Sequence, residues 1–306
     1  VPDEVSVLAV PYLQVFFATV PLMGIQRTLD TCLHAAGDTR TPFYISIVSN
    51  LCHLIAAYGL IYGAWGLPQL GVVGAAAGGV VAGVVGNVCR FWVLYSGRFA
   101  LTLLPSTSYF PERERARKLL KIGIPSALQG LFRNGSNVVY LKLVAMTANP
   151  TVALAAFSIG SQMERSLRRS SLAFGTATTS LVGQRLGAGD PEGAEVRGWT
   201  TLLISVIGLA LLGIPIALLA PHIMAIFTED ADVIAVGIIY LYAMAAAEPF
   251  MCAAITSGAA LRGAGDTMPA LVYTIISQWI IRLPVAYMLA FSFGFDIYGI
   301  WVALVI

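Results

Sequence analysis

The chain has 306 residues, of which 58% are apolar and only 11% charged, and its formal net charge is +2. Soluble domains carry about 25% charged residues, so this composition argues against a water-soluble globule. The small net charge gives no sign of a nucleic-acid partner. The four cysteines lack the spacing of a zinc site or a disulfide framework.

Apolar runs long enough to cross a bilayer follow one another along the chain. They lie near 6–29, 42–63, 70–95, 122–145, 151–182, 198–220, 233–260 and 268–291, and a ninth begins near 297. The chain opens on VPDEV, without a signal-peptide pattern, and closes within an apolar run, GIWVALVI. We therefore expect an all-α multi-pass membrane protein that is truncated at both ends.

The connecting segments alternate in charge. Those at 64–69, 146–150, 221–232 and 292–297 contain no Lys or Arg. Those at 34–41, 96–121, 184–197 and 261–267 hold ten: Arg40, Arg98, Arg113, Arg115, Arg117, Lys118, Lys121, Arg185, Arg197 and Arg262. Because Lys and Arg mark cytoplasmic loops, this pattern predicts a plasma-membrane protein with residue 1 outside.

A short polar turn occurs twice, as AAGDTRTP at 35–42 and GAGDTMP at 263–269. The 228-residue offset between Gly37 and Gly265 also aligns Pro21 with Pro249. The offset corresponds to six spans, which predicts two pseudo-symmetric six-helix lobes related as parallel repeats. We expect a partial first lobe at 1–95, a cytoplasmic linker at 96–121 and a second lobe at 122–306. The PERERARK sequence in the linker fits either a hinge or a solvated basic helix at the membrane surface.

Residues 181–194, LVGQRLGAGDPEGA, lie on the same predicted side as both GDT turns. Together these three elements resemble the MATE family, the multidrug and toxic-compound extrusion transporters. The resemblance implies twelve helices in two lobes, of which this chain would cover the fourth to the eleventh and the start of the twelfth. It also implies a monomer without a cofactor that exports amphipathic, often cationic compounds, driven by inward Na⁺ or H⁺ movement.

The three elements predict cytoplasmic turns rather than binding motifs, because Gly, Asp and Thr clusters are turn chemistry. Thr41 before Pro42 suits a helix N-cap, and Gly187 suits a close-packed turn. Ala75, Gly79 and Gly83 recur every fourth residue and predict close helix packing. The predicted turn residues are Gly37, Asp38, Thr39, Gly183, Gln184, Gly187, Gly265, Asp266 and Thr267.

Ionisable residues inside spans are costly and point to function. We assign them all to the second lobe: Arg133, Glu164, Arg165, Arg168, Arg169, Glu248 and Arg282. Glu164 and Arg168, four residues apart, fit either a structural ion pair or part of a polar cavity. The candidates for a cavity that contacts substrate are Arg133, Arg168, Arg169, Arg282, Gln129 and Tyr240.

Two acids in these spans, Glu248 and Glu164, are candidates for cation coupling, because an antiporter needs a carboxylate that loads and releases a cation. For Glu248 the alternative is a static salt bridge. In the first lobe, many MATE members carry Asp four residues after the Asn equivalent to Asn50, but position 54 here is Leu. His53 fits either coupling or a buried hydrogen bond, and Na⁺ binding in the first lobe is open. We expect Asp30 to pair with Arg27.

Two other classes of function compete with export. A flippase for a lipid-linked saccharide or pyrophosphate lipid shares the broad architecture, and the excess of arginine would suit its substrate. An intramembrane enzyme receives little support, since the spans contain no HExxH, GxSxG or paired Asp motif.

Overall fold

The computed structural model describes residues 3–97, 101 and 112–305. It divides into two compact units, Val1–Phe110 and Pro111–Ile306. The boundary falls inside the segment from 96 to 121 that we predicted to connect two lobes. Most of that segment before residue 112 lies outside the described residues.

Unit 1 consists of three long helices and a short 3₁₀ turn: α1 (Asp3–Ala35), α2 (Arg40–Tyr62), η1 (Ala64–Gly66) and α3 (Val72–Tyr95). Helix α3 packs along both α1 and α2. The predicted small-residue stripe is in the wrong register. A Cβ on Gly79 would touch nothing within 4 Å, whereas one on Gly74 or Gly78 would lie 2.5 Å or 2.8 Å from the backbone of α2. The close contact is therefore made by Gly74 and Gly78.

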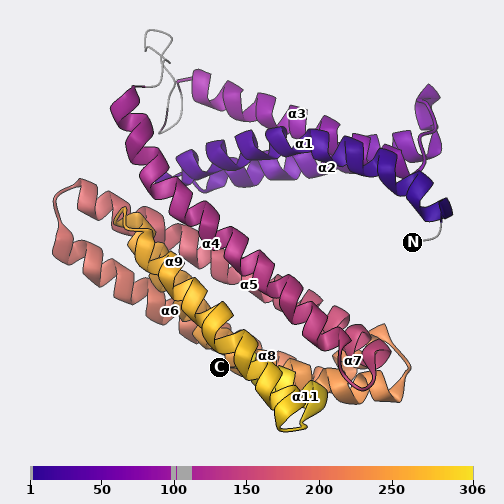
Figure 1. Ribbon diagram of the computed structural model, residues 1–306. Coiled ribbons are helices and arrows are strands. Elements are labelled where there is room, and N and C mark those ends of the chain that lie inside the picture. Colours follow the sequence, from indigo (N-terminus) through magenta and orange to yellow (C-terminus); the bar gives the residue numbers. More distant parts are fainter. Residues whose placement is uncertain (1–2, 98–100, 102–111, 306) are drawn as a thin grey trace. The chain divides into compact units, whose positions relative to one another are not determined.

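Unit 2 is entirely helical in its described residues (Figure 1). Its core forms where α5 packs on α8, with α6 against both and α4 along α9. In chain order its elements are α4 (Arg113–Ala145), α5 (Pro150–Gly187), α6 (Pro191–Leu218), α7 (Ala220–Phe227), α8 (Ala231–Gly263), α9 (Met268–Ile275), the π-helical η2 (Ile276–Arg282), α10 (Leu283–Tyr287), the π-helical η3 (Met288–Ser292) and α11 (Asp296–Val302).

Three predicted boundaries are wrong. Helix α4 begins at Arg113, so the basic ERARK sequence is its first turns rather than a separate linker up to residue 121. The predicted connection at 184–197 shrinks to a turn after Gly187, because Asp190 caps α6 by accepting a 2.8 Å hydrogen bond from the Gly193 N–H. The predicted span 198–220 belongs to a helix that begins at Pro191 and ends at Leu218.

The predicted repeat is visible in the helix boundaries. Helices α1 and α8 end at Ala35 and Gly263, 228 positions apart. The next helices begin at Arg40 and Met268, again 228 positions apart. The end of one helix and the start of the next thus recur at the offset that the two GDT turns predicted.

Among the described residues, six helices are long and apolar enough to cross a membrane by length and composition: those within Ala9–Ala35, Arg40–Tyr62, Val72–Tyr95, Pro191–Leu218, Ala231–Gly263 and Met268–Ser292. Helices α4 and α5, with 33 and 38 residues, are also long enough but carry several charged side chains. Those of α5, among them Glu164 and Arg168, belong to the polar site described next.

Candidate functional site

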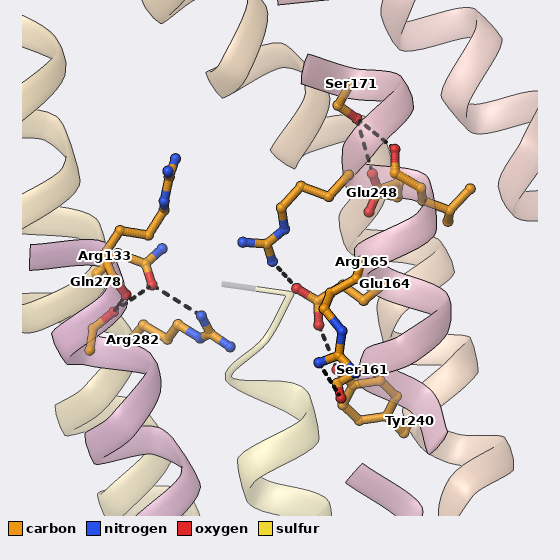
Figure 2. Close-up of polar contacts among 12 residues, drawn as sticks. Arg133, Ser161, Glu164, Arg165, Ser171, Tyr240, Glu248, Gln278 and Arg282 are labelled. Atoms are coloured by element: carbon orange, nitrogen blue, oxygen red, sulfur yellow. Dashed lines mark hydrogen bonds and ion pairs between the residues drawn. The ribbon is translucent and has the colours of Figure 1, made fainter. Parts of the chain in front are cut away.

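The polar site in unit 2 centres on Glu164 of α5. Its carboxylate forms an ion pair with Arg168, one turn further along the same helix, and accepts a 2.6 Å hydrogen bond from the Tyr240 hydroxyl of α8 (Figure 2). The predicted Glu164–Arg168 pair is therefore present, and it has a third member from the repeated helix. Tyr240 is fully buried, so it acts on Glu164 and does not itself face an open cavity.

Tyr240 owes its position to a glycine. A Cβ built on Gly160, one turn before Glu164, would lie 2.2 Å from the Tyr240 ring, so the ring rests on bare backbone. Trp301 closes the other side, edge-on with its ring centroid 4.7 Å away. The ring thus packs against both Gly160 and Trp301, and its hydroxyl donates to Glu164.

A second acid, Glu248, lies two turns after Tyr240 on α8. It is 2% exposed, and the Ser171 hydroxyl of α5 donates to it at 3.2 Å (Figure 2). No Lys or Arg forms an ion pair with Glu248 among the residues that the structure describes. Its hydrogen-bond partner in the described residues is thus a neutral hydroxyl, and a coupling role for Glu248 stays a prediction. Helices α5 and α8 are thus bridged twice, each time by one acid and one hydroxyl.

The arginines around this site are mostly held by neutral groups. Arg165 donates to the Ser161 hydroxyl at 3.0 Å and to the Gln162 amide oxygen at 2.8 Å. Arg282 donates to Gln278 at 3.0 Å and stacks on the Tyr140 ring, 4.2 Å from its centroid. Figure 2 places Arg133, Gln278 and Arg282 on one side and Glu164 with Arg165 on the other.

Within the described part of unit 2, Arg168 is the one intramembrane arginine that pairs with a carboxylate. Arg133 and Arg169 have no carboxylate partner there, and both are exposed. The site therefore carries more positive than negative charge. Gln129 has a different place, since its amide nitrogen donates to the Ala270 carbonyl at 3.1 Å and to the Thr274 hydroxyl at 2.9 Å. It braces α4 against α9, and its role in a cavity remains a prediction.

In unit 1, the candidates Asn50 and His53 both line a cavity of about 270 Å³ between α1, α2 and α3. Tyr12, Thr19 and Gln26 line the same cavity and contribute further polar groups. The structure brings the predicted residues together, but with neutral partners. Among the described residues, no Asp or Glu lines this cavity, and a coupling role for Asn50 or His53 stays a prediction.

The sequence interpretation missed the principal charge of unit 1. Arg90 of α3 is fully buried, and its Nε and Nη2 donate to the Asp30 carboxylate at 2.7 and 3.0 Å. Our assignment of all intramembrane charges to the second lobe is therefore wrong, as is the pairing of Asp30 with Arg27. The two partners are 60 residues apart, and the lone Arg inside the apolar run 70–95 was the signal available in the sequence.

The two GDT turns share a backbone shape but differ in their hydrogen bonds. Gly37 and Gly265 both adopt positive φ, 86° and 80°. The carboxylate of Asp38 accepts from the Arg40 and Thr41 N–H groups at 3.1 and 3.0 Å, and also from the Thr41 hydroxyl. Asp38, one residue before the N-cap position, thus caps the first N–H groups of α2 with its side chain, and the predicted Thr41 cap is wrong because Thr41 donates rather than accepts.

Asp266 forms no matching bond in the described part of the chain, since the residue three positions on is Pro269, which has neither N–H nor hydroxyl. Thr39 and Thr267 stand at the N-cap positions without a side-chain cap bond. Burial raises the pKa of Asp38, but the hydrogen bonds from Thr41 and Arg40 outweigh it and hold that pKa below its ordinary value.

Gly183 and Gln184, predicted as turn residues, instead lie within α5, where a Cβ on Gly183 would lie 3.4 Å from the Gly263 carbonyl. Gly187 is not close-packed as predicted, because a Cβ there would meet nothing within 4 Å. Asp190, which the sequence interpretation did not single out, caps α6 and pairs with Arg185 at 3.1 Å.

Comparison with known families decides the identity of the fold. The MatE family model matches residues 1–59 and 125–288, which is most of the chain and includes the site in α5 and α8. The chain belongs to the MatE family.

Curated MatE relatives match nearly the whole chain. A probable multidrug resistance protein NorM of Thermotoga maritima is 29% identical over 313 residues, which cover 99% of this chain and 64% of that protein. An uncharacterized transporter, YisQ of Bacillus subtilis, is 26% identical over 96% of this chain and 64% of its own length. The chain thus spans slightly less than two thirds of these relatives.

Solved MATE structures have the same fold. An outward-facing multidrug resistance MATE transporter of the MOP superfamily superposes with a TM-score of 0.90 at 22% identity, over 100% of this chain and 67% of that one. A MOP superfamily transporter from Pyrococcus furiosus, whose binding pocket is described as having reverse polarity, gives 0.88 at 20% identity over 97% and 65%. The all-α membrane fold predicted from the sequence is confirmed.

Proposed function

We propose that this MatE protein is a secondary active antiporter of the plasma membrane, which exports small amphipathic, often cationic compounds by alternating access and is driven by inward Na⁺ or H⁺. The observation that carries the proposal is the environment of Glu248. A buried carboxylate needs compensating charge, and the Ser171 hydroxyl supplies only a neutral hydrogen bond. A bound proton or Na⁺ would neutralise the Glu248 carboxylate, and its release would leave the carboxylate charged again.

Glu164 would take part in the same transport cycle, because its hydrogen bond from Tyr240 is the other link between α5 and α8. It shares its two oxygens between Arg168 and Tyr240, so a cation that competes with Arg168 would loosen the α5–α8 contact. Because both acids bridge the same pair of helices, loading one of them would change the hydrogen bonds that hold α5 to α8. Ion binding would then directly change the packing of α5 against α8.

The test is gradient-driven efflux of a fluorescent lipophilic cation from vesicles containing the full-length transporter, with Na⁺ and H⁺ gradients imposed separately. We expect Glu248→Gln to lower gradient-driven efflux by on the order of 100-fold, because Gln keeps a hydrogen bond but cannot bind a cation by charge. Glu229→Gln, at an exposed loop acid, is the matched control and should leave efflux unchanged. Unchanged efflux and ion dependence in Glu248→Gln would contradict the proposal.

A second candidate function is supported by the excess of arginine in unit 2. A flippase for a lipid-linked saccharide or pyrophosphate lipid would use cations such as Arg133 and Arg282, which have no carboxylate partner in the described residues. Transbilayer movement of a labelled pyrophosphate lipid, without gradient-driven cation efflux, would favour this function over antiport. Arg133→Gln should then slow lipid movement, whereas it should affect cation efflux little.

A further inference from the structure

The first turns of α4 carry five basic residues, arranged on two faces. Arg115 pairs with Glu112 at 2.9 Å and Lys118 with Glu114 at 3.0 Å. The remaining three, Arg113, Arg117 and Lys121, are exposed and have no carboxylate partner among the described residues. They are spaced four residues apart, so at about 100° per residue they lie within an arc of roughly 80°. We call these three residues the basic stripe.

The face below the basic stripe is apolar and uncovered by unit 2. Ile124, Leu131 and Val138 follow Arg117 at seven-residue intervals and are 54%, 67% and 69% exposed. The opposite side of α4 is where Pro125, Ser136 and Tyr140 are buried. The stripe and the apolar residues below it therefore point away from the helices of unit 2.

The length of α4 sets the depth of the stripe in the membrane. At 1.5 Å per residue, the part from 122 to 145 spans about 36 Å, enough to fill the roughly 30 Å hydrocarbon core. The turns from 113 to 121 then extend about 12 Å beyond it, at the level of the lipid headgroups. Long Arg and Lys side chains reach to either side of this level.

We propose that the basic stripe of α4 binds the phosphates of anionic phospholipids, with the acyl chains lying along Ile124, Leu131 and Val138. Guanidinium groups without a protein carboxylate are free to form charge-assisted hydrogen bonds with phosphate. The anionic cytoplasmic leaflet attracts basic residues placed at the end of a membrane-crossing helix. The inference relies on the cytoplasmic orientation proposed above, and it does not depend on which compound is exported.

The test compares two double variants of the full-length transporter that lose equal charge from the same turns. Arg113→Gln/Arg117→Gln removes two members of the stripe, whereas Arg115→Gln/Lys118→Gln removes two residues that are already paired. Phosphatidylglycerol is titrated into each detergent-purified protein, with phosphatidylcholine as the neutral lipid, and the melting temperature is followed. We expect the stripe variant to need about fivefold more phosphatidylglycerol, for each cation removed, to reach the same rise in melting temperature as the wild type. The paired variant should need the same amount as the wild type.

An equal loss of the phosphatidylglycerol response in both double variants would overturn the proposal, because net charge rather than the stripe would then set lipid binding. So would a wild-type protein that responds alike to the two lipids, or a stripe variant that responds like the wild type. Arg113→Lys/Arg117→Lys keeps both charges and should retain most of the response. It thereby separates lipid binding from any effect of the substitutions on folding, and efflux by the two double variants remains a separate readout of transport.

Discussion

Each unit buries ionisable groups between two helices, but the two units satisfy them differently. In unit 1, fully buried Arg90 and half-buried Asp30 meet in a two-bond ion pair, so this contact between α3 and α1 is neutral overall. In unit 2, Glu248 is almost as deeply buried, and its side-chain hydrogen-bond partner in the described residues is the Ser171 hydroxyl. The first arrangement cancels the charge with a permanent partner, and the second supports a carboxylate with a neutral group.

The difference teaches how to separate structural from functional charge inside a membrane. A residue whose charge is cancelled by a permanent partner is expected to affect folding when it is removed. A residue supported by neutral groups is expected to affect ion-dependent steps while the fold persists. Burial alone does not distinguish them, since Arg90 and Glu248 are 0% and 2% exposed.

The largest effect should come from breaking the pair in unit 1. Asp30→Ala leaves the Arg90 guanidinium buried without a counter-charge, which should destabilise the protein by about 3–5 kcal/mol. Thermal unfolding in detergent would measure this. Replacing both partners, as Asp30→Leu/Arg90→Met, should recover much of the loss, because no charge is then stranded. A single variant as stable as the wild type would show that the pair is not structural.

A change at Gly160 should be next in size. In Gly160→Ala the new Cβ would meet the Tyr240 ring at 2.2 Å, so the ring must move and the hydrogen bond to Glu164 must break. Overpacking of this kind costs about 1–3 kcal/mol, and we expect a loss of ion-driven efflux with it. Gly187→Ala is the matched control on the same helix, where a Cβ meets nothing within 4 Å. Equal behaviour of the two variants would mean that Tyr240 is free to move.

A smaller effect is expected at Ser171. Ser171→Ala removes the hydrogen bond to Glu248, a change of about 1 kcal/mol in stability. The informative measurement is the Na⁺ or H⁺ concentration that gives half-maximal efflux, which should shift several-fold, whereas Ser171→Thr should restore it. If the ion concentration for half-maximal efflux were unchanged, Glu248 would take no part in the ion-dependent step. Its role would then be structural, like that of Arg90 in unit 1.

The smallest effect should be at the GDT turns, which carry no buried charge. Asp38→Ala should cost about 0.5–1 kcal/mol through the lost cap, and Asp266→Ala less, since Asp266 makes no cap bond in the described chain. Because the pKa of Asp38 is below its ordinary value, its contribution is present above about pH 4 and is lost as the pH falls through its folded pKa. Melting temperatures of wild type and Asp38→Ala should therefore converge at low pH.

Much of the fold could be predicted because it follows from local pattern. The apolar runs predicted most helices, and the GDT turns predicted a repeat offset that fits helix boundaries at Ala35, Gly263, Arg40 and Met268. The Glu164–Arg168 pair was also predictable, since its partners are one helical turn apart. Contacts between distant segments were not. The Asp30–Arg90 pair and the contact between Gly160 and Tyr240 depend on which helix faces meet, and no local pattern encodes that.

The two π-helical segments distinguish the span Met268–Ser292 from its repeat counterpart, α2. Helix α2 has 23 residues, whereas Met268–Ser292 has 25 and contains both η2 and η3. A π-turn holds one residue more than an α-turn, so two π-helical segments match a difference of two residues in length. One of them, η2, carries Gln278 and Arg282, which places a hydrogen-bonded arginine in a span whose counterpart has no Arg, Lys, Asp or Glu after Arg40.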